Sequence, residues 1–258
     1  MKAWLRPVLA IARVAFSEIV RDKILYNVFV VMVLLMGVGY LASRLSYVSP
    51  WRFVTNMGFT GMGLCSLAVG ILVGANAIPR EFERRTAWVA LSHPITRYQF
   101  VWGKMLGICC VLGVNTLIME LVFSVLLLLS GGEWSPIFIY GFWLVMLQAF
   151  LGAAIAILVS SFSTVSLAVT ISIGLSLLGM NISQLRFLSD RAESEAGRLG
   201  LVIASYLIPN FENFQAGEIM AYQLPISPSL AAATTLYAFL VITMFTIIAA
   251  FFLKRREV

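Results

Sequence analysis

The chain has few charged residues for its length. Only 12% of its 258 residues are charged, whereas 60% are hydrophobic, and the mean hydropathy is +0.94. An ordinary soluble domain is about half apolar and about a quarter charged. The shortage of charge therefore excludes a soluble globular protein and indicates an integral membrane protein.

Histidine and cysteine are also scarce, with one histidine and three cysteines in the whole chain. Cys65, Cys109 and Cys110 all fall in apolar segments, so we interpret them as buried packing residues rather than disulfides. With no Cys-x-x-Cys pair, the usual ligands predict no metal site and no cofactor on this chain. His93 lies in a polar segment, which excludes a serine–histidine protease within the bilayer.

A phosphate-binding loop is missing as well. Gly103-Lys104 is followed by Met105, and no glycine lies five residues before Gly103. The chain therefore lacks the pattern with which nucleotide hydrolases hold phosphate, and we predict that it is not itself an enzyme. If transport is active, another protein supplies the energy.

Long apolar runs are what the chain has instead. A helical span needs about 20 mostly apolar residues, and the runs do not alternate apolar and polar residues as the strands of a barrel do. The first run continues at full span length, which predicts a membrane helix rather than a cleaved signal peptide. The sequence predicts an all-α integral membrane protein with six transmembrane helices, at Ile24–Ser43, Val54–Ile78, Met105–Leu129, Pro136–Ser160, Thr164–Met180 and Leu230–Leu253.

The basic residues predict the orientation of these spans. Thirteen of the 18 Lys and Arg residues precede the first span, lie in the polar segment 79–104 or follow the last span. Because basic residues concentrate on the cytoplasmic side, we expect both termini and this segment in the cytoplasm and the loop 181–229 outside the inner (cytoplasmic) membrane. The net charge of +6 then reflects topology and anionic membrane lipids, not nucleic acid.

Residues 3–21 have the pattern of an amphipathic helix. Basic residues recur at helical spacing on one face, and Trp4 and aliphatic residues lie on the other. Such a helix lies in a membrane interface. We therefore predict an N-terminal elbow helix within residues 1–23, which either braces the bundle or serves only as an anchor.

Two pairs of glycines are spaced four residues apart. Gly70 and Gly74 lie in the second predicted span, and Gly103 and Gly107 lie at the start of the third. Small residues at this spacing let another helix approach closely. The pattern favours tight helix packing at both places, without saying which helices meet there.

Glu120 is the one acidic residue inside a predicted span. An ionisable group near the middle of the membrane is costly, and is therefore a candidate for function. Thr116 and Ser124 lie four residues either side of it and share its helical face. These three residues could line a transport pathway or couple protons, or a protonated Glu120 could simply be held by a neighbouring hydroxyl or carbonyl group.

Three stretches of the segment 79–104 form an ordered pattern. They are Glu81-Phe-Glu83-Arg-Arg-Thr86, Leu91-Ser92-His93-Pro94-Ile95-Thr96-Arg97 and Phe100-Val-Trp-Gly103-Lys104. This pattern resembles the coupling segment of ABC-2-type transporter permeases, the membrane subunits that work with a separate ABC ATPase. Further matches at residues 207–212 and 254–257 extend the resemblance over nearly the whole chain. The most similar subgroup is the six-span permeases that include the NosY type of copper-centre maturation systems.

The resemblance implies a fold and a set of coupling residues. Residues 1–258 would form one ABC-2 (type V-like) exporter permease domain, with a cytoplasmic coupling helix in the segment 79–104. Pro94 would end that helix and Thr96 would cap the next one. The residues expected to couple to the ATPase are Glu81, Glu83, Arg84, Arg85, Thr86, Pro94, Arg97 and Lys104.

The resemblance also implies partners. Six spans are half of the twelve that such permeases use, so we expect a homodimer with two copies of an ABC ATPase, which would bind the ATP and Mg²⁺. Membrane lipids and an accessory protein outside the membrane are further expected partners. Two alternatives stay open, a secondary transporter that uses Glu120 and a membrane anchor that recruits a soluble partner without transport. The substrate class is open between a lipid, a peptide, an ion and a small sulfur or metal species.

Overall fold

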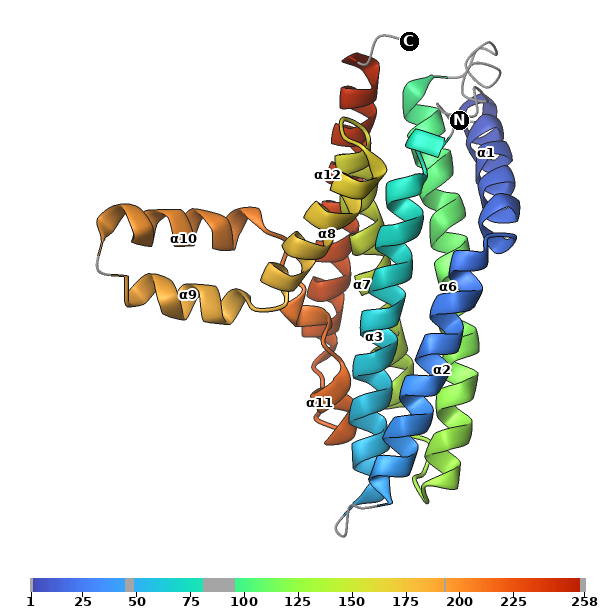
Figure 1. Cartoon of the computed structure of the whole chain (residues 1–258), viewed down its shortest axis with the longest axis vertical. Helices are drawn as coiled ribbons and strands as arrows, with labels where there is room; N and C mark the ends of the chain where they lie inside the picture. Colours follow the sequence, from blue (N-terminus) through green and yellow to red (C-terminus); the bar gives the residue numbers. More distant parts are fainter. Residues whose placement is uncertain (1, 45–48, 81–95, 193, 256–258) are drawn as a thin grey trace.

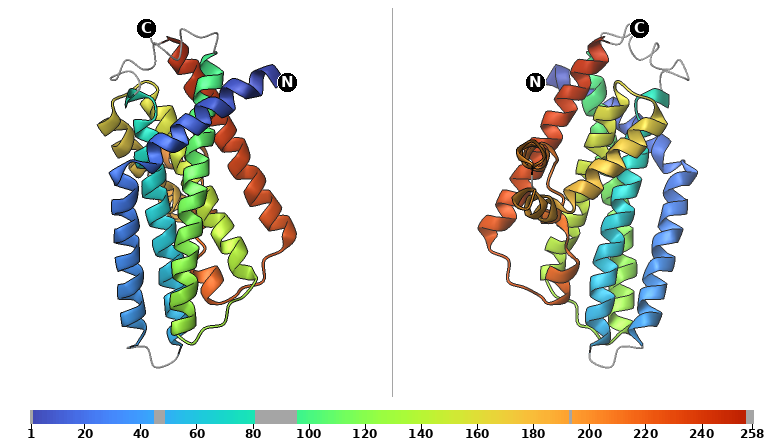
Figure 2. Two further views of the ribbon diagram at one scale, coloured as in Figure 1. Left: turned by 90° about the vertical axis from the view of Figure 1, so that its right-hand side faces the viewer. Right: turned by 60° about the vertical axis from the view of Figure 1, so that its left-hand side comes forward.

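The computed structural model describes residues 2–44, 49–80, 96–192 and 194–255, and these residues form helices and connecting turns with no strand (Figure 1). Five long helices run along the long axis of the molecule and form a bundle (Figures 1 and 2). They are α2 (Lys23–Ser43), α3 (Pro50–Asn76), α6 (Arg97–Leu129), α7 (Ile137–Ser160) and α12 (Pro228–Arg255). The expected all-α fold is confirmed for the described part of the chain.

Four of these helices, α3, α6, α7 and α12, are long and apolar enough to cross a membrane. A fifth candidate is the pair α8 (Val165–Gly179) and α9 (Ile182–Asp190), which bends by 67° at the break between the two helices. The apolar helix recognised within α2 is Val28–Ser43, which is shorter. By length and composition the described residues hold four spans, or five with the bent pair, so the predicted count of six is not confirmed.

The helix α6 is longer than a membrane is thick. Its 33 residues extend over about 50 Å at 1.5 Å per residue, whereas the hydrocarbon core of a bilayer is about 30 Å thick. The polar and charged residues at its start, Arg97, Gln99 and Lys104, indicate which end projects beyond the hydrocarbon. The first turns of α6 therefore lie at the membrane boundary, although Phe100 and Val101 there are packed into the core.

The helix α7 forms the centre of the core. It has no charged residue, and 78% of its apolar window is buried within the molecule. A methyl group added to Gly70 or Gly74 of α3 would collide with the backbone of Ala149 or Ala153 in α7. The close contact predicted at the first glycine pair is thus confirmed, and its partner is α7.

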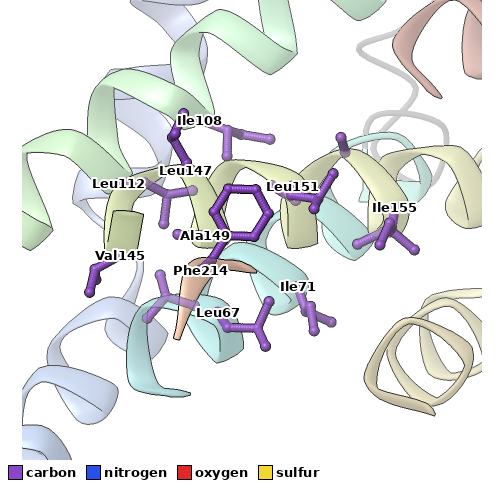
Figure 3. Packing of buried hydrophobic residues seen from close by; sticks show 14 of the residues in the cluster. Leu67, Ile71, Ile108, Leu112, Val145, Leu147, Ala149, Leu151, Ile155 and Phe214 are labelled. Carbon is purple, nitrogen blue, oxygen red and sulfur yellow. The ribbon is translucent and has the colours of Figure 1, made fainter. Parts of the chain in front are cut away.

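Large side chains fill the space around this contact. Figure 3 shows aliphatic residues from α3, α6 and α7 meeting there, together with the ring of Phe214. The labelled aliphatic residues are Leu67, Ile71, Ile108, Leu112, Val145, Leu147, Ala149, Leu151 and Ile155. Within lipid, this van der Waals packing holds helices together, since lipid tails are as apolar as the side chains.

The helix α1 (Lys2–Val20) crosses α6 near the end of the bundle that carries both termini (Figure 2). A methyl group on Gly103 would come within 2.6 Å of the Ile11 Cβ, and one on Gly107 within 2.7 Å of the Ala12 carbonyl oxygen. The second glycine pair therefore also makes its predicted close contact, and its partner is α1. The predicted N-terminal helix is present, whereas its place as an elbow in the membrane interface stays a prediction.

The segment 181–229, predicted as a long outer loop, is largely helical. The helices α9 and α10 (Glu195–Leu207) form a hairpin that projects sideways from the bundle (Figure 1). The apolar run at 199–208 lies in α10 and its end, and its residues Tyr206 and Leu207 are each 80% exposed. The hairpin therefore presents apolar surface outside the core of this chain.

The chain returns to the bundle through η1 (Glu212–Phe214) and α11 (Gly217–Ala221), and α11 packs against α3 and α7. The Phe211 N–H donates to the Gly179 carbonyl oxygen at 2.9 Å, and the side chains of Phe211 and Phe214 are fully buried. This contact lies at the end of α8, where the fifth predicted span, Thr164–Met180, also ends and where the chain bends into α9.

Both termini lie at one end of the bundle (Figure 1). The end of α3 and the start of α6, which flank residues 81–95, lie at the same end, and the turn between α6 and α7 lies at the other (Figures 1 and 2). The arrangement agrees with the prediction that the termini and the segment 79–104 share one membrane face. Which face this is stays a prediction.

Candidate functional site

Most of the predicted coupling residues lie outside the described residues. They are Glu81, Glu83, Arg84, Arg85, Thr86 and Pro94. The structure does describe the two flanks of this stretch, which are the end of α3 with Arg80 and the start of α6 with the remaining predicted residues, Arg97 and Lys104. The candidate site therefore consists of these flanks and of the elements that contact them.

The start of α6 is fixed by a capping box. The Thr96 hydroxyl accepts a hydrogen bond from the Gln99 N–H at 3.3 Å, and the Gln99 side-chain oxygen accepts one from the Thr96 N–H at 2.8 Å. Such a cap stabilises a helix by about 1 kcal/mol. The predicted cap at Thr96 is thus confirmed, and it sets the residue at which the segment 79–104 becomes α6.

Two ion pairs connect the flanks to α1 and to the turn that follows it. The Arg80 guanidinium, just after α3, pairs with the carboxylate of Asp22, in the turn between α1 and α2. The Lys104 ammonium group on α6 lies 3.5 Å from a carboxylate oxygen of Glu18 on α1. The segment 79–104 therefore begins and ends beside cations that are held by α1 and the turn after it.

These four charged residues line a small cavity between α1, α3 and α6, together with Asn76. The cavity has a volume of about 40 Å³, which is room for a water molecule and not for a substrate. The Asn76 side chain donates to the Leu72 carbonyl oxygen at 2.7 Å, so it is already bonded within α3. The cluster thus has the character of a joint between helices.

Arg97 connects the same region to the last helix. Its guanidinium donates a hydrogen bond to the Leu253 carbonyl oxygen near the end of α12. A charged donor on a backbone carbonyl is a strong contact, and positive charge suits the C-terminal end of a helix. The start of α6 is therefore attached to both the first and the last helix of the chain.

The predicted pathway residues lie farther along α6. Thr116 and Glu120 line one groove of 580 Å³ between α6 and α7. The Thr116 hydroxyl donates to the carbonyl oxygens of Leu112 and Gly113, both at 3.0 Å, so its hydrogen is already bonded within α6. The structure thus brings Thr116 and Glu120 together, whereas Ser124 is half-buried and is not part of the groove lining.

The sequence pattern did not reveal the two acidic residues that pair with Arg80 and Lys104. Glu18 and Asp22 interrupt the basic pattern of the N-terminal helix, and this interruption was the signal that could have found them. A second omission is Asn115, which is 4% exposed and whose side-chain oxygen has no hydrogen-bond partner among the described residues. Asn115 lies one residue before Thr116, on the buried face of α6.

Comparison with known proteins supports one family. A family model described as ABC-2 family transporter protein matches residues 9–258, which is almost the whole chain. No curated protein matches the sequence. The family match covers the helix α1 from residue 9 on, both flanks of the segment 79–104, the groove and the hairpin.

Proposed function

The chain belongs to the ABC-2 family of transporter proteins, and on this premise we propose that it is the permease subunit of an ATP-driven exporter in the cytoplasmic membrane. Members of this family are membrane components and not the ATPase itself. The observation that carries the proposal is the pair of ionic contacts that hold the flanks of the segment 79–104 against α1 and the turn after it. A separate ABC ATPase would bind this segment and supply the energy.

The contacts support a route for mechanical coupling. The segment is continuous with α3 at one end and with α6 at the other, and α1 and the turn after it are ion-paired to the two flanks. A displacement of the segment would therefore move α1, α3 and α6 as one unit. Because α3 packs through its glycines on the backbone of α7, that motion would reach the centre of the core.

We propose that the functional permease is a homodimer that binds two ATPase subunits. The helices α2, α3, α6, α7 and α12 together with the bent pair α8 and α9 would supply six crossings, half of the twelve that permeases of this type use. Both termini and the segment 79–104 would face the cytoplasm, in line with the excess of basic residues there. The NosY-type subgroup and the accessory protein stay predictions. The substrate class stays open.

Charge reversal tests the coupling directly. We expect Glu81→Lys combined with Glu83→Lys to abolish the stable complex with the partner ABC ATPase, because acidic residues at such a contact surface pair with cations of the partner. The measurement is co-purification, followed by ATP hydrolysis by the complex in lipid nanodiscs. Glu195→Lys, on the exposed surface of α10, is the matched control and should leave both unchanged.

Two outcomes would count against the proposal. An intact complex with normal ATP hydrolysis after the double reversal would remove Glu81 and Glu83 from the coupling surface. A mass measurement that finds one permease copy in the complex would contradict the homodimer. Transport that continues without the ATPase would instead favour a secondary transporter that uses Glu120.

A further inference from the structure

The groove beside Glu120 has the dimensions of a small-molecule site. It reaches from Pro136, just before α7, to Gly113 and Met146 farther along the bundle, and its volume is 580 Å³. Sites for small ligands have volumes of about 300–1,000 Å³. The groove therefore has room for a small organic molecule.

Aromatic rings form one wall of the groove. Tyr140, Phe142 and Trp143 all line it, and Tyr140 and Trp143 also line a second groove of 470 Å³ that continues toward α12. The Trp143 indole N–H donates to the Thr235 hydroxyl of α12 at 3.0 Å, which fixes the ring in place. Figure 2 shows that α6 and α12 diverge away from the end with the termini, and that α7 lies between them.

Glu120 is the acidic residue of this site. Among the described residues no lysine, arginine or histidine lines either groove, and none of them donates a hydrogen bond to the Glu120 carboxyl group. A carboxylate in apolar surroundings is stabilised by a cation, and the faces of aromatic rings attract cations as well. The two features therefore favour the same class of ligand.

We propose that this groove binds small lipophilic organic cations, with the positive centre at Glu120 and the apolar body against the aromatic wall. Glu120 lies nine residues before the end of α6, which is about 14 Å along the helix axis. A phospholipid does not fit this position, because its charged headgroup stays at the membrane surface. Binding is a property of this chain alone and does not depend on coupling to an ATPase.

The test uses two probes of nearly equal shape and opposite charge, tetraphenylphosphonium and tetraphenylborate. The full-length protein is purified in nanodiscs of a neutral lipid, and binding is measured by equilibrium dialysis against empty nanodiscs. We expect saturable binding of tetraphenylphosphonium, weakened at least about tenfold by Glu120→Gln, since the variant removes the charge and keeps the shape. Glu133→Gln, in the exposed turn before α7, is the matched control and should bind as the wild type does.

A second variant tests whether binding needs the space in the groove, independently of Glu120. Ile139→Trp fills the groove from a position that is 59% exposed, so the bundle can tolerate it, and it should weaken cation binding although Glu120 is intact. Equal binding of the cation by wild type and Glu120→Gln would overturn the proposal, as would equal saturable binding of both probes. Failure here would leave the ATPase complex intact, so the outcome is distinct from a failure of the proposed coupling.

Discussion

At the scale of single residues, Lys104 shows how a buried charge becomes part of a joint. Its side chain is 6% exposed, and its ammonium group lies 3.5 Å from a Glu18 carboxylate oxygen. Removing an ammonium group from water costs several kcal/mol unless a partner compensates for it. Loss of the acid alone therefore costs more than the replacement of both partners by neutral groups.

We expect Glu18→Gln to lower the free energy of unfolding by about 1–3 kcal/mol, less than for a fully buried pair because Glu18 is 34% exposed. The double variant Glu18→Gln with Lys104→Met should recover most of that loss. Thermal unfolding of the purified permease in detergent measures both, with Glu195→Gln on α10 as control. If the single variant were as stable as the wild type, the other contacts of Lys104 would suffice to hold its charge.

At the scale of helices, the glycines decide how closely the elements approach. Gly74 faces the backbone of α7, where a methyl group would lie 2.6 Å from the Ala153 carbonyl oxygen. Gly61 lies on the same helix with open space around it, since nothing is within 4 Å of an added methyl group. The two positions form a matched pair with the same chemistry and different surroundings.

Gly74→Ala should therefore destabilise the permease by about 1–3 kcal/mol, because α3 and α7 must separate to admit the methyl group. Gly61→Ala should be neutral or stabilising by up to about 1 kcal/mol, because it only restricts the unfolded chain. Melting temperatures in the same detergent measure the difference. Equal melting temperatures for the two variants would show that α3 and α7 can separate to admit the methyl group without loss of stability.

The helix features that could be predicted are those that depend on residues close together in the sequence. The cap at Thr96 and the two glycine pairs depend on residues three or four positions apart, so a pattern is enough to find them. The bend after α8 is different, since it depends on Phe211, which is far from the break along the chain and packs against it in space. The apolar run thus predicted the fifth helix to within one residue at each end, at Thr164–Met180, but not the bend of 67° that follows it or the helix α9 beyond.

At the scale of the whole molecule, the two ends of the bundle differ in chemistry. The end with the termini carries the ion pairs and the flanks of the segment 79–104, and the other end carries the turn at 130–136. The ion pairs join residues 58 and 86 positions apart, and sequence patterns do not reveal such pairings. The segment 79–104 could be singled out from the sequence, and its role as a coupling surface stays a prediction, whereas the contacts of its flanks with α1 and the turn after it could not be foreseen.

Accessibility to a membrane-impermeant maleimide tests the orientation. In a variant with Cys65, Cys109 and Cys110 replaced by alanine, Glu133→Cys should be labelled in cells whose inner membrane is intact. Tyr98→Cys, at the exposed start of α6, should be labelled only after that membrane is opened. Both side chains are exposed, so access differs only through the membrane. The reverse pattern would place the termini outside.

The hydrogen bond between Arg97 and the Leu253 carbonyl has a consequence for how the protein assembles during its synthesis. These residues are 156 positions apart, and Leu253 lies in the last helix. While the chain is being synthesised, the early helices can insert and pair, but the start of α6 cannot gain this attachment until α12 has left the ribosome. The surface proposed for the ATPase is thus completed last, which would keep unfinished chains from recruiting the motor.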